Sequence, residues 1–116
     1  MKIVKYNEFK ELGDPRVAKL NLAKQKYPEI TDLSLYELDF IIPYAISEDA
    51  SLNNLQLLEH TNSIIKAVRD RTIIELMKKR GMLKEAGPGE IIHLTEKETL
   101  IKEYLSDFAK LSGLSS

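Results

Sequence analysis

The side chains that could carry out chemistry in this 116-residue sequence are few and widely spaced. His60 and His93 are its only histidines, and neither belongs to a metal-ligand spacing such as HExxH. The absence of cysteine excludes disulfides, thiolate catalysis and zinc fingers. No glycine pattern of a nucleophile elbow, a dinucleotide-binding turn or a P-loop occurs either. We therefore predict no catalytic residues, no metal site and no cofactor.

The charges are unevenly distributed along the chain, although the net charge is only −1. Residues 66–84 carry seven basic and two acidic side chains, a sum of +5, whereas residues 1–65 and 85–116 each sum to −3. This basic segment is the one plausible footprint for an anion such as DNA. The alternative is a solvated helix face balanced by acidic neighbours. The basic residues are Lys66, Arg69, Arg71, Lys78, Lys79, Arg80 and Lys84.

A second pattern lies in residues 38–66, which read LDFIIP, then NLQLL, then Asn62 and Lys66. The succession resembles the HNH nuclease pattern DHIIP…NLQLL…N…K. The resemblance implies a ββα-metal shape in which the first His activates water, the central Asn orients the hairpin, and the last His or Asn binds the metal. Phe40 stands in the place of that first His and can neither accept a proton nor polarise water. The resemblance therefore implies a degenerate relative, with Asp39 and His60 as its remaining candidate ligands.

The C-terminal third of the chain has the turn and cap residues expected for a helix, a β-hairpin and a second helix in succession. Gly81 is placed to end a helix, Gly87-Pro88-Gly89 predicts a turn, and residues 90–94 have the β-branched run of a short strand. Thr95 and Glu98 then form a capping box for a last helix. This order resembles the C-terminal half of winged helix-turn-helix domains, which often run RGLL, a short turn, a strand and LTEKG.

Upstream, residues 2–6 predict a short strand or extended arm, followed by a turn of helix over residues 8–12 that Gly13 closes. Asp14-Pro15 is an N-cap and first-turn pair for a helix that must end by Tyr27-Pro28.

The middle of the chain is less clear. Ser34 and Glu37 suggest a capping box, but the apolar residues of segment 35–46 fit helical and strand spacing equally. After a polar loop, Leu52, Leu55 and Leu58 predict a short amphipathic helix.

The segment 62–80 has apolar residues on two sides of a straight helix. The apolar residues of its N-terminal part lie almost opposite those of its C-terminal part around the helix axis. Either this helix is buried on two sides, or the chain breaks near residues 69–72 and restarts with Thr72 as cap and Glu75 three residues later. The two sets are Ile64, Ile65 and Val68, and Ile73, Leu76 and Met77.

The last helix, residues 96–111, carries a broad apolar face. That face either packs back on the N-terminal helix to complete the core or forms a homodimer seam. Its main residues are Leu100, Tyr104, Phe108 and Leu111.

Together these features predict a mainly α fold, a single small helical domain with a β-hairpin wing of the winged helix-turn-helix type. Its parts are an arm and helix (1–30), a helix-turn-helix with the wing (31–95) and a C-terminal helix (96–116).

The predicted function is non-catalytic binding of nucleic acid, as double-stranded DNA, through the basic segment. The alternative is a small helical protein–protein interaction module (an inhibitor, adaptor or viral accessory factor) that meets an acidic protein surface. The third hypothesis is that the protein is a degenerate relative of the HNH nucleases. No apolar run approaches the roughly 18 residues of a membrane span and no signal peptide is evident, so we expect a cytoplasmic, intracellular protein.

Overall fold

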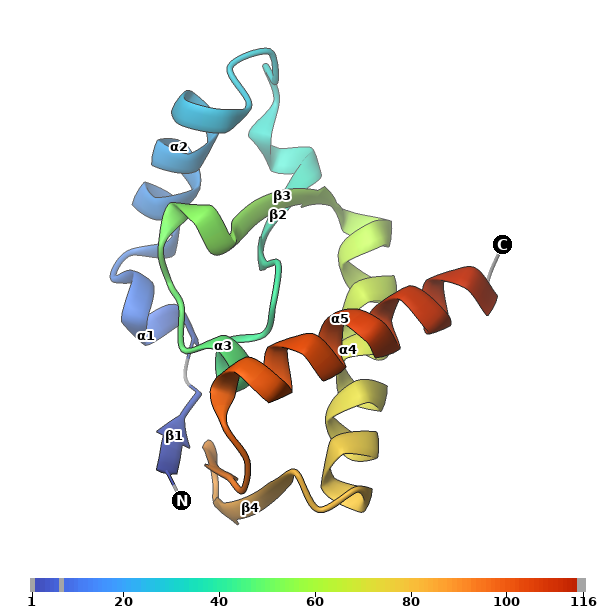
Figure 1. The fold of residues 1–116 in the computed structure, drawn as a ribbon. Helices are drawn as coiled ribbons and strands as arrows, with labels where there is room; N and C mark the ends of the chain where they lie inside the picture. Colours follow the sequence, from blue (N-terminus) through green and yellow to red (C-terminus); the bar gives the residue numbers. More distant parts are fainter. Residues whose placement is uncertain (1, 7, 115–116) are drawn as a thin grey trace.

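The computed structural model describes residues 2–6 and 8–114. Five helices and five strands occur within them (Figure 1). In chain order they are β1 (Lys2–Lys5), α1 (Glu8–Leu12), α2 (Pro15–Lys26), β2 (Tyr36–Phe40), α3 (Tyr44–Ser47), β3 (Leu55–Glu59), α4 (His60–Lys79), β4 (Leu83–Gly87), β5 (Glu90–His93) and α5 (Lys97–Leu114). Single turns of 3-10 helix at Leu33–Leu35 and Leu52–Asn54 precede β2 and β3.

The prediction of a mainly α fold is wrong. The chain is a mixed α/β protein, 57% helical and 21% strand, with a three-stranded antiparallel sheet ordered β1-β5-β4 and a two-stranded sheet β2-β3. Strand β3 was not expected, and β2 corresponds to the strand alternative of segment 35–46. The two pair from Tyr36 opposite Glu59 to Phe40 opposite Leu55. Within the ambiguous segment, residues 36–40 form a strand because their alternating side chains bury one face of a hairpin, and their partner residues lie 15 to 23 positions further on. Residues 44–47 are helical.

The short helix predicted from the leucines at 52, 55 and 58 is also wrong. Leu52 belongs to the 3-10 turn, whereas Leu55 and Leu57 lie on β3 and are buried by strand alternation. The predicted Ser34–Glu37 capping box is not formed. Asp32 caps the turn before β2 instead, where its carboxylate accepts from the backbone N–H of Ser34 at 3.0 Å.

The N-terminal elements and the hairpin with its turn at Gly87–Gly89 were predicted correctly, whereas the winged-helix resemblance stays a prediction. Asp14 caps α2 by accepting from the N–H of Arg16 at 2.9 Å, and α2 ends before Tyr27-Pro28. The hairpin β4-β5 turns at Gly87–Gly89, and Gly89 takes the positive φ of 68° that favours glycine. The β1 strand adds to this hairpin through β5, which the sequence did not indicate.

Segment 62–80 lies on one continuous helix, α4, and neither alternative suggested by its apolar pattern is correct. Ile73 and Met77 are fully buried, whereas Ile64, Ile65 and Val68 are exposed. Helix α4 is therefore buried on one side only, and its N-terminal apolar residues face outward.

Two hydrophobic clusters hold these elements. The first joins the three-stranded sheet to α3, α4 and α5, and consists of Val4, Ala45, Ile46, Ile73, Met77, Leu83, Ile91, Leu100 and Tyr104. The second fixes α2 against the β2-β3 hairpin, and consists of Leu22, Ala23, Phe40, Leu55 and Leu57.

Helix α5 crosses α4 and packs mainly on α3 and α4, not on the N-terminal helices (Figure 1). Of the four residues predicted as a dimer seam, Leu100 and Tyr104 are buried inside the chain, and Phe108 and Leu111 pack against the first cluster. These residues therefore serve the intramolecular core, and a homodimer stays a prediction. The predicted Thr95–Glu98 capping box does not occur among the described hydrogen bonds. The first helical bond runs from the Leu100 N–H to the Glu96 carbonyl.

Candidate functional site

The most unusual feature of the chain is a buried ammonium group between the β2-β3 hairpin and α4. Lys66 is only 6% exposed. Its Nζ lies 2.7 Å from the carbonyl oxygen of Phe40, 2.7 Å from Asp70 Oδ2 and 3.1 Å from Asp39 Oδ2. Three acceptor groups therefore satisfy the three protons of the ammonium.

The network extends from Lys66 into α5. Tyr104 Oη donates to Asp70 Oδ1 at 2.6 Å and lies 3.2 Å from the Ile41 carbonyl, while Gln56 Nε2 donates to Asp39 at 2.8 Å. Burial raises the pKa of Asp70, although the hydrogen bonds from Lys66 and Tyr104 oppose the change. Burial also raises the pKa of Tyr104, so its phenol remains a donor. One polar cluster thus ties β2, α4 and α5 together.

The loop between β2 and β3 is fixed by a single buried side chain, Asn54. Its Oδ1 accepts from the N–H of Ile42 at 2.9 Å. Its Nδ2 donates to the Ile42 carbonyl at 2.9 Å and to the Asp49 carbonyl at 2.8 Å, and lies 3.2 Å from Ser47 Oγ. The amide closes the loop on itself, and the hairpin it shapes leads directly into α4.

The residues named by the HNH resemblance lie on opposite faces of β2. Asp39 faces α4 and contacts Lys66, whereas Phe40 is 5% exposed and packs in the cluster with α2. His60 opens α4, and its Nδ1 lies 3.4 Å from the Glu37 carboxylate. Asn62, two residues further along, is exposed. The cation that Asp39 contacts is therefore an ammonium of the chain itself.

Four of the seven predicted basic residues contact other parts of the chain. Lys66 is buried, and the Arg69 guanidinium lies 5.8 Å from the Phe108 ring centroid. Lys78 pairs with Glu75 and Glu85, and Arg80 pairs with Glu103 and Asp107. Hydrogen bonds to Glu85 and to Asp107 raise the pKa of Lys78 and of Arg80 respectively. The acidic partners therefore largely neutralise the charges of Lys78 and Arg80.

The other three, Arg71, Lys79 and Lys84, are exposed and make no ion pair within residues 2–6 and 8–114. They do not share one face. Arg71 and Lys79 lie about 80° apart around α4. Lys84 alternates with Leu83 and Glu85, both of which face α4, so Lys84 points to the other side of β4. The structure thus disperses the basic segment.

A hollow of about 380 Å³ lies between the β2-β3 hairpin, α4 and α5. We call it the α4–α5 groove. Its apolar lining comes from Ile41, Leu58, Ile65, Leu105 and Phe108, and its polar lining from Gln56, Asn62, Lys66, Arg69 and Tyr104.

Large apolar side chains are exposed at this groove. Ile65 and Leu105, in its walls, are 43% and 51% exposed. Ile64 and Val68, further around α4 and outside the lining of the groove, are 52% and 56% exposed. Apolar surface of this kind, gathered beside a concave site, is typical of a binding surface.

Comparison with protein-family models, curated proteins and solved structures found no match. Within the described part of the chain, no helix is both long and apolar enough to cross a bilayer. No group of three His, Asp or Glu side chains among the same residues is arranged to hold a metal ion.

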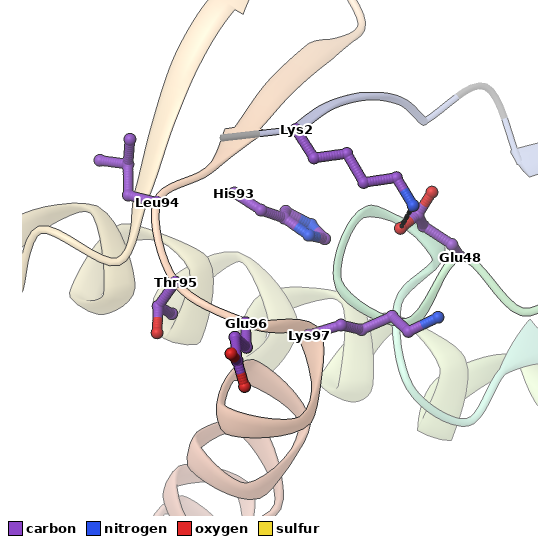
Figure 2. A pocket seen from close by; sticks show the side chains of 7 residues that line it. All are labelled: Lys2, Glu48, His93, Leu94, Thr95, Glu96 and Lys97. Carbon is purple, nitrogen blue, oxygen red and sulfur yellow. Dashed lines mark ion pairs between the residues drawn. The ribbon is translucent and has the colours of Figure 1, made fainter.

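A second hollow, of about 370 Å³, lies where β5 leads into α5 (Figure 2). His93 forms part of it and is 4% exposed, and its Nε2 donates to the Ala45 carbonyl at 2.7 Å. Lys2 Nζ lies 2.8 Å from Glu48 Oε1, as Figure 2 shows. Glu48 has a φ of 54° at the C-cap of α3, so its backbone adopts a conformation that favours glycine. Lys2 and Glu48 are paired with each other and His93 is bound to a backbone carbonyl, which makes this hollow the weaker candidate.

Sequence reasoning missed the internal role of Lys66 and the whole role of Asp70. A signal was present, because Lys66, Asp70, Ile73 and Met77 follow the i, i+4, i+7, i+11 spacing of one helix face. Extending the buried face of α4 backward from Met77 leads directly to both charged residues.

Proposed function

We propose that this chain is a non-catalytic protein–protein interaction module that binds its partner at the α4–α5 groove. The observation that carries the proposal is the exposure of Ile65 and Leu105 in the walls of one hollow. Removing such surface from water is favourable by about 25 cal/mol per Å². The same helix buries Ile73 and Met77 in the core, whereas Ile64, Ile65 and Val68 lie outside that core.

A display selection tests this proposal. Peptides selected from a random library on the immobilised protein should lose at least about tenfold in affinity against Leu105→Glu, because a charge in the wall opposes burial of an apolar side chain. Leu20→Glu is the matched control, since Leu20 is 49% exposed on α2, away from the groove. The proposal is wrong if selected peptides bind both variants equally, or if none is enriched over a blank surface.

A second candidate function is binding of nucleic acid by a catalytically silent relative of the ββα nucleases. The supporting observation is that Asn54 fixes a hairpin which leads directly into α4, with Asp39 on the strand before it. Lys66 holds Asp39, and Phe40 faces the core, so this candidate involves no cleavage.

Salt-dependent binding to random duplex DNA tests this second candidate. Arg71→Ala with Lys79→Ala should reduce the slope of log affinity against log salt by about two, one for each lost phosphate contact. Lys10→Ala with Lys24→Ala, exposed lysines on α1 and α2, removes the same charge and should leave the slope nearly unchanged. Absence of duplex binding by the wild-type protein at low salt would eliminate this candidate.

A further inference from the structure

The Lys66 network separates two hollows on the two sides of the buried line of α4. Lys66 and Tyr104 line the α4–α5 groove. Asp39 and Asp70 line another hollow, of about 480 Å³, between α4, the loop after β2 and the three-stranded sheet. We call it the α4–sheet hollow. Lys66 and Asp70 lie about 40° apart around α4, so their ion pair crosses from one hollow to the other.

Tyr104 extends the network from this ion pair to the wall of the groove. Its Oη carries one proton and has two acceptors within reach, Asp70 Oδ1 at 2.6 Å and the Ile41 carbonyl at 3.2 Å. The contact with Asp70 is the shorter one, and an ionised carboxylate is the stronger acceptor, so the phenol donates to Asp70. The Ile41 carbonyl belongs to a residue that lines the groove, and it has the weaker of the two contacts.

A proton added to Asp70 reverses the direction of the hydrogen bond with Tyr104. Lys66 Nζ already donates to Asp70 Oδ2 at 2.7 Å, so the proton binds Oδ1, which faces Tyr104 Oη. The carboxyl then donates to Oη, because a protonated carboxyl has one O–H and a phenol oxygen accepts. The phenol proton turns to the Ile41 carbonyl. Each of these groups keeps a partner in both states, and the added proton is the only one that enters.

Asp70 is placed to take up that proton in the folded chain. Its side chain is 16% exposed and lines the α4–sheet hollow. Burial raises the pKa of Asp70, whereas the hydrogen bonds from Lys66 and Tyr104 oppose the rise. Burial also raises the pKa of Tyr104, so the phenol keeps its proton. The other ionisable groups that face Asp70 or line the same hollow are Tyr6, Asp39, Arg71, Glu75, Lys78 and Glu85.

These surrounding groups leave Asp70 as the site of the change. Lys78 holds both Glu75 and Glu85, and Lys66 and Gln56 hold Asp39. The negative charge of Asp39 raises the pKa of Asp70 further, although less than burial does.

From these contacts, and resting on the function proposed above, we propose that Tyr104 relays protonation of Asp70 to the Ile41 carbonyl and so makes the wall of the α4–α5 groove responsive to pH. In the ionised state Asp70 holds the hydroxyl of Tyr104 toward α4. In the protonated state the hydroxyl bonds the residue that follows β2, and the network loses one negative charge because Lys66 keeps its proton. A two-state hydrogen bond of this kind is sufficient for a local switch.

Carbon NMR of the isotope-labelled protein tests the relay without any ligand. During a titration from about pH 7 to about pH 4, the carboxyl carbon of Asp70 and the backbone carbonyl carbon of Ile41 should shift with one midpoint. That midpoint should lie above 3.8, the ordinary value for an aspartate. An Ile41 carbon that stays in place while Asp70 titrates would overturn the proposal.

Three variants separate the relay from a general effect of acid. In Tyr104→Phe, which fills the same space without the hydroxyl, Asp70 should still titrate and the Ile41 carbon should lose that step. In Asp70→Asn the amide donates to Tyr104 Oη at every pH, so the Ile41 carbon should stay at its acid value. Tyr6→Phe is the matched control, because Tyr6 lines the α4–sheet hollow outside the network, and it should preserve both titrations. An Ile41 titration that is unchanged in Tyr104→Phe would refute the relay.

Failure of the relay and failure of the interaction module are separate results. The titrations use the free protein, so a display selection that enriches no peptide rejects the module while the Ile41 carbon still decides the relay. A selected peptide should bind the wild-type protein with an affinity that changes with pH at the midpoint of Asp70. An affinity that is constant across that midpoint would overturn the link between the relay and the groove.

Discussion

Replacing Lys66 by Met should lower the free energy of unfolding by about 3–5 kcal/mol, the usual cost of removing one partner from a buried ion pair. Met keeps most of the side-chain volume, so the loss reports on charge more than on packing. Without the ammonium, Asp39, Asp70 and the Phe40 carbonyl lose their shared donor. Denaturant unfolding followed by circular dichroism measures the loss. Lys79→Met, an exposed position on the same helix, should stay within about 0.5 kcal/mol of wild type.

The loss should also depend on pH. Burial raises the pKa of Asp70 above its ordinary value of 3.8, and the contacts with Lys66 oppose that rise. A carboxyl whose folded-state pKa is raised favours folding when protonated, so its contribution is lost as pH rises from 3.8 through the folded-state pKa. Removing Lys66 raises that pKa further. The variant should therefore lose stability with rising pH more steeply than wild type. A loss that is the same at about pH 4 and about pH 7 would contradict the network.

Coupling within the network gives a further check on the same prediction. Adding Asp70→Asn to Lys66→Met removes one of the two uncompensated carboxylates, so part of the loss should return. The two changes should therefore be non-additive, as expected for side chains in direct contact. Strict additivity would mean that Lys66 stabilises the chain by some other route.

Local signals in the sequence were sufficient for several elements. The ends of α2 and the turn of the β4-β5 hairpin were predictable, because Pro or Gly restricts the backbone at each of them. The residues concerned are Asp14-Pro15, Tyr27-Pro28 and Gly87-Pro88-Gly89. Strand β3 was not predicted and β2 stayed ambiguous, because the identity of both depends on a partner strand that no local pattern specifies.

The candidate site was harder to predict for an electrostatic reason. Charged residues are almost never buried unless they are paired. Lys66 was therefore assigned to a basic surface, and its partner Asp39 is 27 residues away in the sequence. The phase of the α4 helix carried the needed information, but the usual rule that charge faces solvent outweighed it. The groove was missed for the converse reason, because exposed Ile65 and Leu105 look like core residues in the sequence.

Replacing Asn54 by Ala should lower the free energy of unfolding by about 2–4 kcal/mol. The N–H of Ile42 and the carbonyl of Asp49 would each lose the partner that Asn54 provides, and an unsatisfied buried polar group costs about 1–3 kcal/mol. The Ile42 carbonyl would keep its hydrogen bond from Ser47 Oγ. Asn53→Ala is the matched control, because Asn53 is the adjacent asparagine and is exposed. Denaturant unfolding of the two variants measures the difference. Equal effects at both positions would show that the amide of Asn54 does not fix the loop.

Hydrogen exchange places the effect of Asn54→Ala within the structure. The amide of Ile42 should exchange faster in the variant, because its acceptor is the lost Oδ1. The exchange rates of amides in α2 and in the β4-β5 hairpin should change only as much as the global stability predicts. Ile41 precedes this loop and lines the α4–α5 groove, so loosening the loop also disturbs one wall of the groove. The Asn54→Ala protein should therefore bind groove ligands more weakly than Asn53→Ala, even under conditions where both are fully folded.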